Sequence, residues 1–415
     1  MKKILLSFFL SWCFGSHAFE FSVDRLVYST DGAAAGECRL IGVVEGSDFS
    51  GECLVIPEII KTGDDTYIVT SIASHAFSGQ DVAAVEIPVG VKSIGGWVFS
   101  GCRRLKEVGL PSGLEVIGDY CFQDNVSLSA VNIPASVMEI GQGVFRGCSS
   151  LDEVEFKTPI TDLPDYFFYD CVSLKSLSFT SDIREVGEHC FNNCVSLNDF
   201  DFSAMARIGE RAFSGCKGLE RVVLKSSLAD VSDGAFEHCE GLKTLVLAPN
   251  IMTVGELAFD GCSQLKELEI GNSTSYIGSG AFANCNSLRE IYVVNEVPPS
   301  ITVTSFPRRA YLSATLFVSR NSKIQFSQSP YWDNFSNIIG VDEFPLEVQD
   351  VSQEKVRINL EGGRLTIMGS GYVKVTSIDG VMIFQGMIDQ YKEIDMTDDS
   401  LPIIVNAEGK NIKVM

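Results

Sequence analysis

The chain has 415 residues, of which 54 are acidic and 32 are basic, giving a net charge of −22. Apolar residues make up 45% of it, which is ample for a buried core and excludes a chain that is disordered throughout. The acidic surplus repels phosphate backbones and anionic membranes. We therefore expect no nucleic-acid partner and, if the charge serves binding, a basic or cationic one.

The first predicted element is an export signal over residues 1–18. Two lysines precede an apolar run over residues 4–14, and small residues at positions 16 and 18 suit cleavage after Ala18. The run is too short to span a membrane, and no later apolar stretch is longer, so we expect no transmembrane helix in the mature chain. Cys13 leaves a lipoprotein anchor open, although the bulky Trp12 before it argues against one.

Residues 19–70 are predicted to form a β-rich N-terminal cap. They contain short apolar alternations, such as those from Cys38 to Val44 and from Cys53 to Ile56. A stacked array needs such a cap to cover its open edge. A disulfide between Cys38 and Cys53 is left open, because exported chains meet oxidising conditions.

A phenylalanine then returns every 22 or 23 residues in the same local setting. A fixed period in this range is typical of a solenoid of stacked coils. We therefore predict about ten coils over residues 71–293, with the repeated rings stacked in one column inside and the strands of successive coils paired in parallel. The ten rings belong to Phe77, Phe99, Phe122, Phe145, Phe168, Phe191, Phe213, Phe236, Phe259 and Phe282.

Each repeat follows one frame, for which the coil after Phe99 is an example. Leu105, Val108 and Leu110 are spaced as a short strand with one buried side, and the proline after Leu110 ends it. The pair Ile117-Gly118 then marks a second extended piece. A glycine at that place indicates either a positive φ or a close approach of two backbones.

Cysteines follow the same frame. Eight of them stand three residues after a repeat phenylalanine, and Asn125 takes this place once. No C-x-x-C pair occurs, so the spacing favours buried structural thiols over a metal site. In this position a small polar group can satisfy the loop backbone of its own or the next coil. The eight are Cys102, Cys148, Cys171, Cys194, Cys216, Cys239, Cys262 and Cys285.

The frame Cys-x-x-Leu-x-x-Val-x-Leu-Pro…Ile-Gly…Ala-Phe-x-x-Cys resembles the BspA-type leucine-rich repeats of bacterial surface proteins, over residues 71–293. The resemblance implies a leucine-rich repeat solenoid with a parallel β-sheet face. The family includes surface-exposed adhesins and binding proteins of host-associated bacteria, so it also implies display at the cell surface, without fixing a ligand.

One coil departs from the frame. At Phe168 the usual Ile-Gly pair is replaced by Leu163-Pro164, and Tyr166, Phe167 and Tyr169 crowd around the repeat ring. We expect this coil to be distorted. The extra rings either add bulk to the core or form an exposed contact patch.

After Tyr292 the frame decays, and residues 294–345 are predicted to be an irregular terminal repeat and C-cap. Thr315 to Val318 is the predicted last strand, and the aromatics of Tyr331–Phe335 are expected to seal the final repeat. Residues 346–415 are predicted to be a separate, small all-β domain.

Five short strand candidates in this domain are 364–368, 373–378, 382–385, 403–405 and 411–414. Their order is similar to that of the C-terminal sorting domains of the type IX secretion system, which implies transport across the outer membrane. A plain β-sandwich is the alternative.

No catalytic constellation emerges from the sequence. His17 belongs to the export signal, and His75, His189 and His238 stand beside repeat phenylalanines, where we expect the surface. The motifs H-E-x-x-H and G-x-S-x-G and the phosphate loop are absent from the sequence. We therefore expect no enzyme, cofactor or metal, and instead an exported protein that binds a host or bacterial surface protein or glycan. A passive envelope spacer and, further behind, a carbohydrate-active enzyme with paired carboxylates are the alternatives.

Ten outward positions between the buried strand residues form the predicted binding face. They would stack from coil to coil. These positions are mostly acidic, and their negative field would steer a basic partner or, as a second choice, hold Ca²⁺. A solvated sheet face that binds nothing is the plain alternative. The ten residues are Glu107, Glu153, Glu155, Asp199, Asp201, Arg221, Glu267, Glu269, Glu290 and Tyr292.

Overall fold

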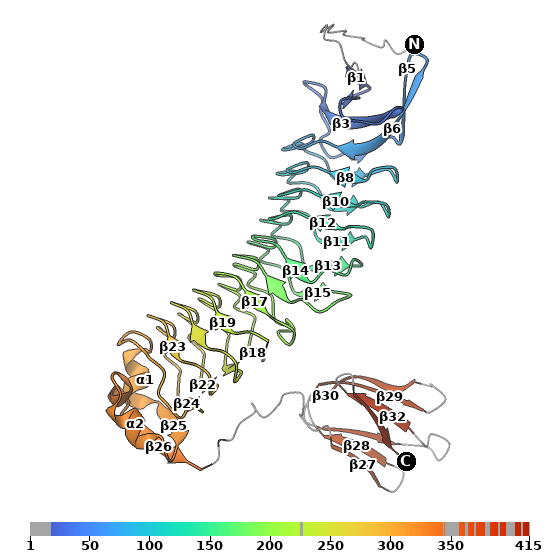
Figure 1. Cartoon of the computed structure of the whole chain (residues 1–415). Coiled ribbons are helices and arrows are strands. Elements are labelled where there is room, and N and C mark those ends of the chain that lie inside the picture. Colours follow the sequence, from blue (N-terminus) through green and yellow to red (C-terminus); the bar gives the residue numbers. More distant parts are fainter. Residues whose placement is uncertain are drawn as a thin grey trace. The chain divides into compact units, whose positions relative to one another are not determined.

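The computed structural model describes residues 18–224, 227–342 and 344, and beyond them the backbone of seven strands between residues 357 and 414. The chain divides into two compact units, Met1–Phe344 and Pro345–Met415 (Figure 1). Residues 1–17 of the predicted export signal, with Cys13, lie outside the described residues.

The N-terminal strands form a mixed sheet that leads into the repeats. β1 (Glu20–Val23), β2 (Leu26–Ser29) and β3 (Glu37–Val43) pair antiparallel, and β3 pairs in parallel with β6 (Asp65–Ile72). β5 (Ile59–Thr62) forms a hairpin with β6. The end of β6 then pairs in parallel with the first short strand of the solenoid, so the mixed sheet continues directly into the stack.

The disulfide that the sequence left open between Cys38 and Cys53 is not formed. Cys38 is a fully buried residue of β3, whereas Cys53 is exposed on β4 (Cys53–Val55), which belongs to a different sheet. Both thiols are free, because the two strands direct them to different environments.

The solenoid carries two ladders of strands, both parallel throughout (Figure 1). We call the first the long-strand ladder. It comprises β4, β7 (Ala84–Glu86), β9 (Glu107–Gly109), β11 (Ala130–Ile133), β13 (Glu153–Phe156), β15 (Ser176–Ser178), β18 (Arg221–Leu224), β20 (Thr244–Leu247), β22 (Glu267–Ile270), β24 (Glu290–Val293), β25 (Thr315–Ser319) and β26 (Asn337–Val341).

The second, short-strand ladder carries the Ile-Gly position of each repeat. It comprises β8 (Ser93–Ile94), β10 (Val116–Ile117), β12 (Glu139–Ile140), β14 (Asp162–Leu163), β16 (Glu185–Val186), β17 (Arg207–Ile208), β19 (Asp230–Val231), β21 (Thr253–Val254) and β23 (Tyr276–Ile277). The predicted solenoid with a parallel sheet face is thus confirmed. Its last strand is β26 rather than the predicted Thr315–Val318, which lies in β25.

A column of phenylalanine rings runs through the interior. All ten predicted rings have no exposed surface. Each stacks on the next with ring centroids 5.1–5.8 Å apart and planes within 18° of parallel. Phe306 adds an eleventh ring at 5.2 Å. The predicted single column is confirmed, and it sets the spacing of the coils.

The glycine of the Ile-Gly pair is required by close backbone approach. A Cβ on Gly118 would lie 2.5 Å from the carbonyl carbon of Gly95, closer than real Cβ contacts. Positive φ occurs instead two residues before and two residues after each repeat ring, as at Trp97 (φ 54°) and Gly101 (φ 73°) around Phe99. Of the two readings that the sequence offered for this glycine, the structure selects the close approach.

The repeat cysteines tie neighbouring coils together. Each of the eight thiols donates a hydrogen bond to the backbone oxygen of the repeat phenylalanine in the preceding coil, with Sγ···O distances of 3.1–3.3 Å. The prediction of buried structural thiols is confirmed for all eight. Asn125 is equally buried, but within the described residues neither its side-chain nitrogen nor its side-chain oxygen has a hydrogen-bond partner.

Aromatic residues close the C-terminal end of the column. Two six-residue helices, α1 (Arg308–Ser313) and α2 (Lys323–Gln328), flank β25, and a 3₁₀ turn spans Trp332–Asn334. Trp332 and Phe335 are buried and pack against Phe306, while Tyr331 stays exposed. Among the described residues no helix has the length and hydropathy that crossing a membrane requires.

The unit Pro345–Met415 contains two antiparallel sheets among its described strands. One joins β27 (Arg357–Glu361), β28 (Arg364–Met368) and β31 (Tyr391–Asp395). The other joins β30 (Met382–Ile388), β29 (Gly371–Ser377), β32 (Ile403–Ala407) and β33 (Lys410–Val414). All five predicted strands are present. β27 and β31 were missed, and β31 gives no alternation because Lys392 and Glu393 are adjacent.

We expect the substitution Phe236→Ala to lower the free energy of unfolding by about 3–5 kcal/mol, because it empties one fully buried place in the column. Urea denaturation followed by far-UV circular dichroism measures the change. Phe236→Leu is the control and should cost less than half as much. A loss below about 1 kcal/mol for the alanine variant would contradict a stabilising role for the ring column.

We expect Asn125→Cys to raise the free energy of unfolding by about 1–3 kcal/mol, since it replaces a buried amide without partners by a thiol that can donate to Phe99. Thermal and urea unfolding report the change. The reverse exchange, Cys148→Asn, should lower stability by a similar amount. Destabilisation by Asn125→Cys would show that the amide is satisfied in solution.

Candidate binding face

Side chains alternate across the long-strand ladder, and this alternation creates the outward face. In β13, Val154 and Phe156 point into the core, while Glu153 is exposed and Glu155 is half-buried. Successive strand residues point to opposite sides, so the outward residues of neighbouring coils fall into register. Glu153 pairs across with Ala130 and Ser176, and Glu155 with Asn132 and Ser178.

The predicted face is therefore divided into separate groups. Glu107 stands alone on β9, opposite Ala84. Glu153 and Glu155 lie on β13 between neutral neighbours. The structure brings the remaining seven predicted residues into two places, one around Asp199 and one on β22 and β24.

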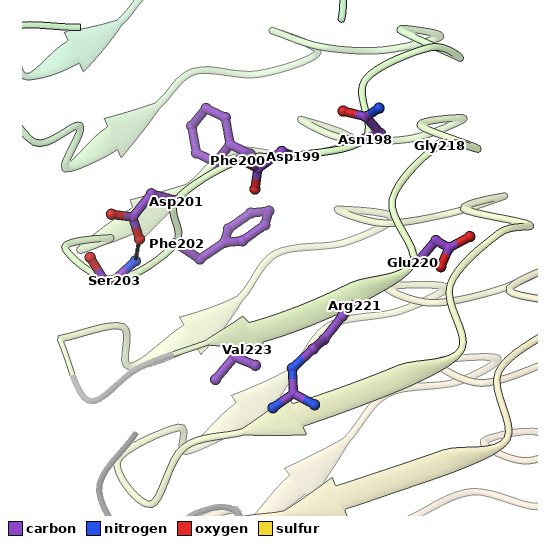
Figure 2. Close-up of a pocket in the computed structure, with 10 residues that line it drawn as sticks. All are labelled: Asn198, Asp199, Phe200, Asp201, Phe202, Ser203, Gly218, Glu220, Arg221 and Val223. Carbon is purple, nitrogen blue, oxygen red and sulfur yellow. Dashed lines mark hydrogen bonds between the residues drawn. The ribbon is translucent and has the colours of Figure 1, made fainter. Parts of the chain in front are cut away.

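The first place is a break in the long-strand ladder. The segment Asn198–Phe202 forms no strand, and within the described residues β15 pairs only with β13 and β18 only with β20. Beside it opens a hollow of about 630 Å³ lined by Asp199, Asp201 and Arg221 (Figure 2). Three predicted residues from two coils thus share one concave surface.

Further side chains line the same hollow. Phe200 and Glu220 contribute to its wall, and Phe200 also lines a second hollow of about 280 Å³ on the other side of the segment, together with Leu177 and Phe179. Phe200 and Glu220 were not among the predicted residues. The backbone N–H of Ser203 donates to the carboxylate of Asp201 at 2.8 Å, which fixes the turn at one rim (Figure 2).

The break has a visible cause in the sequence. Phe200 and Phe202 occupy the two core-facing strand positions. At the first position the other coils have an aliphatic residue, whereas the second is also a phenylalanine in the two preceding coils, at Phe156 and Phe179. The rings of Phe200 and Phe202 meet the ring of Phe213 edge-on, at centroid distances of 5.1 and 5.2 Å. The coil is also one residue shorter, because Met205 follows Phe202 by three positions, whereas Leu228 follows Leu224 by four. A large ring at the first core position, on a coil that is one residue shorter, prevents the flat path of a strand.

The second place lies on β22 and β24. Glu267 is directly opposite Glu290, and Glu269 is opposite Tyr292. The Tyr292 hydroxyl donates to Glu290 at 2.7 Å. Partial burial, then this hydrogen bond and the nearby carboxylates, raise the pKa of Tyr292. The Tyr292 ring stacks on Phe317 of β25 at 4.7 Å, so it is held in a fixed orientation.

Glu269 was expected to be open to partners, and this expectation is wrong. Only 7% of the residue is exposed. It stands in register between Val246 and Tyr292, whose side chains flank it. The carboxylates of this group that face solvent are those of Glu267 and, in part, Glu290.

A second aromatic row lies on the coil turns, at the positive-φ position two residues before the repeat ring. His75, Trp97 and Tyr120 stack at 5.2 Å, Gly143 interrupts the row, and His189 stacks on Tyr166 at 5.1 Å. His75 is exposed and His189 is half-buried, so these turns do reach the surface. Stacking in the row stabilises the positive-φ backbone conformation, which residues other than glycine adopt at an energetic cost.

The distorted coil at Phe168 contains both arrangements that the sequence left open. Phe167 is fully buried and meets the rings of Phe145 and Phe168 edge-on. Tyr166 and Tyr169 are half-exposed, and the guanidinium of Arg146 lies 4.9 Å from the Tyr169 ring. The coil therefore adds one ring to the core and two to the surface.

Few described residues can hold a cofactor or a metal. The cysteines of the repeat frame are buried, bonded to backbone oxygens and separated by whole coils. In the described part of the chain, one group of ionisable side chains is close enough for metal binding, namely Glu237, His238 and Asp260. It lies on coil turns outside the predicted face.

Two ladders of parallel strands around a column of repeat rings define a leucine-rich repeat solenoid. The family model described as "BspA type Leucine rich repeat region (6 copies)" matches residues 70–198 and 186–312, together more than half of the chain. The chain belongs to the BspA-type leucine-rich repeat family. A search of curated proteins found no match.

Several solved structures are similar. A leucine-rich cell surface protein from Faecalibacterium prausnitzii A2-165 is 21% identical, with 78% of this chain and 99% of that chain covered and a TM-score of 0.47. A leucine-rich repeat protein from Bacteroides ovatus ATCC 8483 is 21% identical, with 78% and 100% covered and a TM-score of 0.41. The pneumococcal vaccine antigen PcpA is 20% identical, with 78% and 99% covered and a TM-score of 0.44.

We expect the stability of the chain to fall above about pH 8.5, where cysteine thiols of the unfolded chain ionise. Burial raises the pKa of Cys102 and of Cys239 to about 12 in the folded chain. The folded state therefore keeps protons that the unfolded state loses, and each such thiol weakens folding by about 1.4 kcal/mol per pH unit between the two pKa values.

Urea unfolding under reducing conditions between pH 7 and pH 10 measures this slope. Cys239→Ala removes one of the thiols, so its stability should fall less steeply with pH than that of the unmodified chain. Equal slopes for the two proteins would show that the folded thiols ionise as readily as the unfolded ones.

Proposed function

We propose that this chain is an exported, non-catalytic protein of the cell surface that binds a protein or glycan through the outward side of its long-strand ladder. Membership of the BspA-type family supports display at the surface, as does the export signal that the sequence predicts. One observation carries the binding part of the proposal. The break at Asn198–Phe202 gathers Asp199, Asp201 and Arg221 around one hollow, where an uninterrupted sheet would present a flat face.

The hollow suits recognition better than catalysis. Its lining includes the carboxylates of Asp199, Asp201 and Glu220, the Phe200 ring and the guanidinium of Arg221, but no histidine or cysteine. Carboxylates of this kind favour basic side chains or the hydroxyl groups of sugars, and the ring offers an apolar contact. The acidic surplus of the chain would steer a basic partner toward it.

Two alternatives differ in what they predict. A passive envelope spacer predicts that the unmodified protein binds no surface ligand and that whole repeats can be deleted without effect. A carbohydrate-active enzyme predicts turnover of a glycan rather than simple retention. Screening the protein on one panel of matrix proteins and glycans separates the binding protein, the spacer and the enzyme, because both binding and product formation are recorded.

We expect the fourfold variant Glu153→Gln, Glu155→Gln, Asp199→Asn, Asp201→Asn to bind its surface ligand at least tenfold more weakly than the unmodified chain. It removes four charges from the proposed face and none from the core. Full-length protein is first screened on arrays of matrix proteins and glycans, and the affinity for each hit is then measured by surface plasmon resonance at two salt concentrations.

A control variant carries four charge-neutralising substitutions on the short-strand side, Glu139→Gln, Asp162→Asn, Glu210→Gln and Asp230→Asn. These residues are also exposed, so the control changes the net charge by the same amount. It should retain the affinity. Unchanged binding by the fourfold variant, or an equal loss in the control, would contradict the proposed face.

We further propose that residues 346–415 act as a sorting domain of the type IX secretion kind. The support is the order of strands that the resemblance rests on, together with the two antiparallel sheets of this unit. In the native bacterium, a chain ending at residue 345 should accumulate in the periplasm, whereas the full chain reaches the outer surface or the medium. Cell fractionation with immunoblotting distinguishes the two, and surface display of the shortened chain would favour a plain β-sandwich.

A further inference from the structure

Glu237, His238 and Asp260 lie together on two neighbouring coil turns. Glu237 and His238 directly follow the repeat ring of Phe236, and Asp260 directly follows that of Phe259. Because the rings stack in register, the turns bring the three side chains together, with one potential ligand atom from each within 4.8 Å of the others. Within the described part of the chain, no other set of histidine, cysteine, aspartate and glutamate side chains meets this limit.

The spacing is close to that of a metal site. Glu237 Oε1 lies 3.8 Å from His238 Nε2. Ligand atoms on a tetrahedral zinc ion, with bonds of about 2.0–2.2 Å, lie roughly 3.3–3.6 Å apart. A small inward movement of the exposed His238 side chain would bring these two atoms to the spacing that a bound ion requires.

Each carboxylate is held in place by a neighbouring coil. Arg211 Nη1 donates to Glu237 Oε2 at 2.8 Å, which leaves Oε1 toward the histidine. Asn284 Nδ2 donates to Asp260 Oδ1 at 2.8 Å. Partners of this kind, one shell away, orient carboxylate ligands in metal sites and are often worth a factor of 10–100 in metal affinity.

The surroundings allow an ion to enter from one side. The side chain of Glu237 is 12% exposed and Asp260 is 9% exposed, whereas the side chain of His238 is 56% exposed. The His238 ring lies over Gly261, where a Cβ would sit 2.3 Å from Nδ1, so glycine at this position leaves room for the imidazole. Two largely buried carboxylates and one exposed imidazole thus form a shallow site that is accessible from solvent.

We propose that Glu237, His238 and Asp260 bind a divalent transition-metal ion of the Zn²⁺ class, with water completing the coordination. Imidazole favours Zn²⁺, Ni²⁺ and Cu²⁺ over Ca²⁺, which takes oxygen ligands only and more of them. The two carboxylates and Arg211 leave the group with one net negative charge, so a dication is attracted. The site is separate from the proposed binding face and does not depend on it.

Isothermal titration of the full-length, chelator-treated protein with ZnCl₂ tests the site. The measurement uses a Cys53→Ser background, because that exposed thiol is a competing ligand. One saturable Zn²⁺ per chain is expected, with CaCl₂ giving no comparable signal. His238→Ala and Asp260→Asn should each weaken binding at least tenfold, and Asn284→Ala should weaken it about 10- to 100-fold by releasing Asp260.

His189→Ala is the matched control. His189 is a partly exposed histidine on another coil turn, and it should leave the Zn²⁺ affinity unchanged. Thermal unfolding adds an independent readout, since Zn²⁺ should raise the melting temperature of the parent protein and of His189→Ala but not of His238→Ala. Absence of saturable binding, or equal binding by His238→Ala and the parent, would overturn the proposal.

Discussion

Everything in the solenoid depends on the contact between one coil and the next at the repeat phenylalanine. Its ring stacks on the ring of the following coil at 5.1–5.8 Å, and at eight of the coils its backbone oxygen accepts the thiol hydrogen bond of the following coil. One residue thus supplies both the apolar and the polar part of the coil-to-coil contact. Because a single repeat cannot bury this surface alone, stability comes from stacking, and the fixed period of 22 or 23 residues follows from it.

The same constraint explains where the molecule departs from regularity. Coils that obey the frame present a flat, alternating face with little relief. The coil around Phe200 and Phe202 keeps its place in the ring column but cannot keep its strand, because it has a large ring at the first core position and is one residue shorter. The short strand of this coil, β17, still pairs with β16, although among the described residues it has no pairing with β19. The hollow is therefore a local opening beside a ring column that continues past it, which is how a rigid scaffold can offer a particular site.

Much of this architecture could be read from the sequence, since period and alternation are one-dimensional signals. The ring column, the parallel ladders and the thiol positions follow from spacing alone. The hollow did not, because its cause is a volume mismatch and one missing residue, whose outcome depends on packing in three dimensions. Glu269 was misjudged for a similar reason, since its outward position says nothing about how closely Val246 and Tyr292 flank it. The proximity of Glu237 and Asp260 could have been predicted, because both residues stand one place after a repeat ring.

The sealed thiols have a consequence for how this chain matures. Before its coils have stacked, the chain holds eight repeat cysteines, with one interval of 46 residues and six of 22 or 23, and any two could be joined by an oxidant. Once each Sγ is turned toward a backbone oxygen of the preceding coil, it is out of reach. In an oxidising compartment, coil nucleation then competes with wrong disulfide formation, so the speed of folding, more than final stability, determines how much of the chain folds correctly.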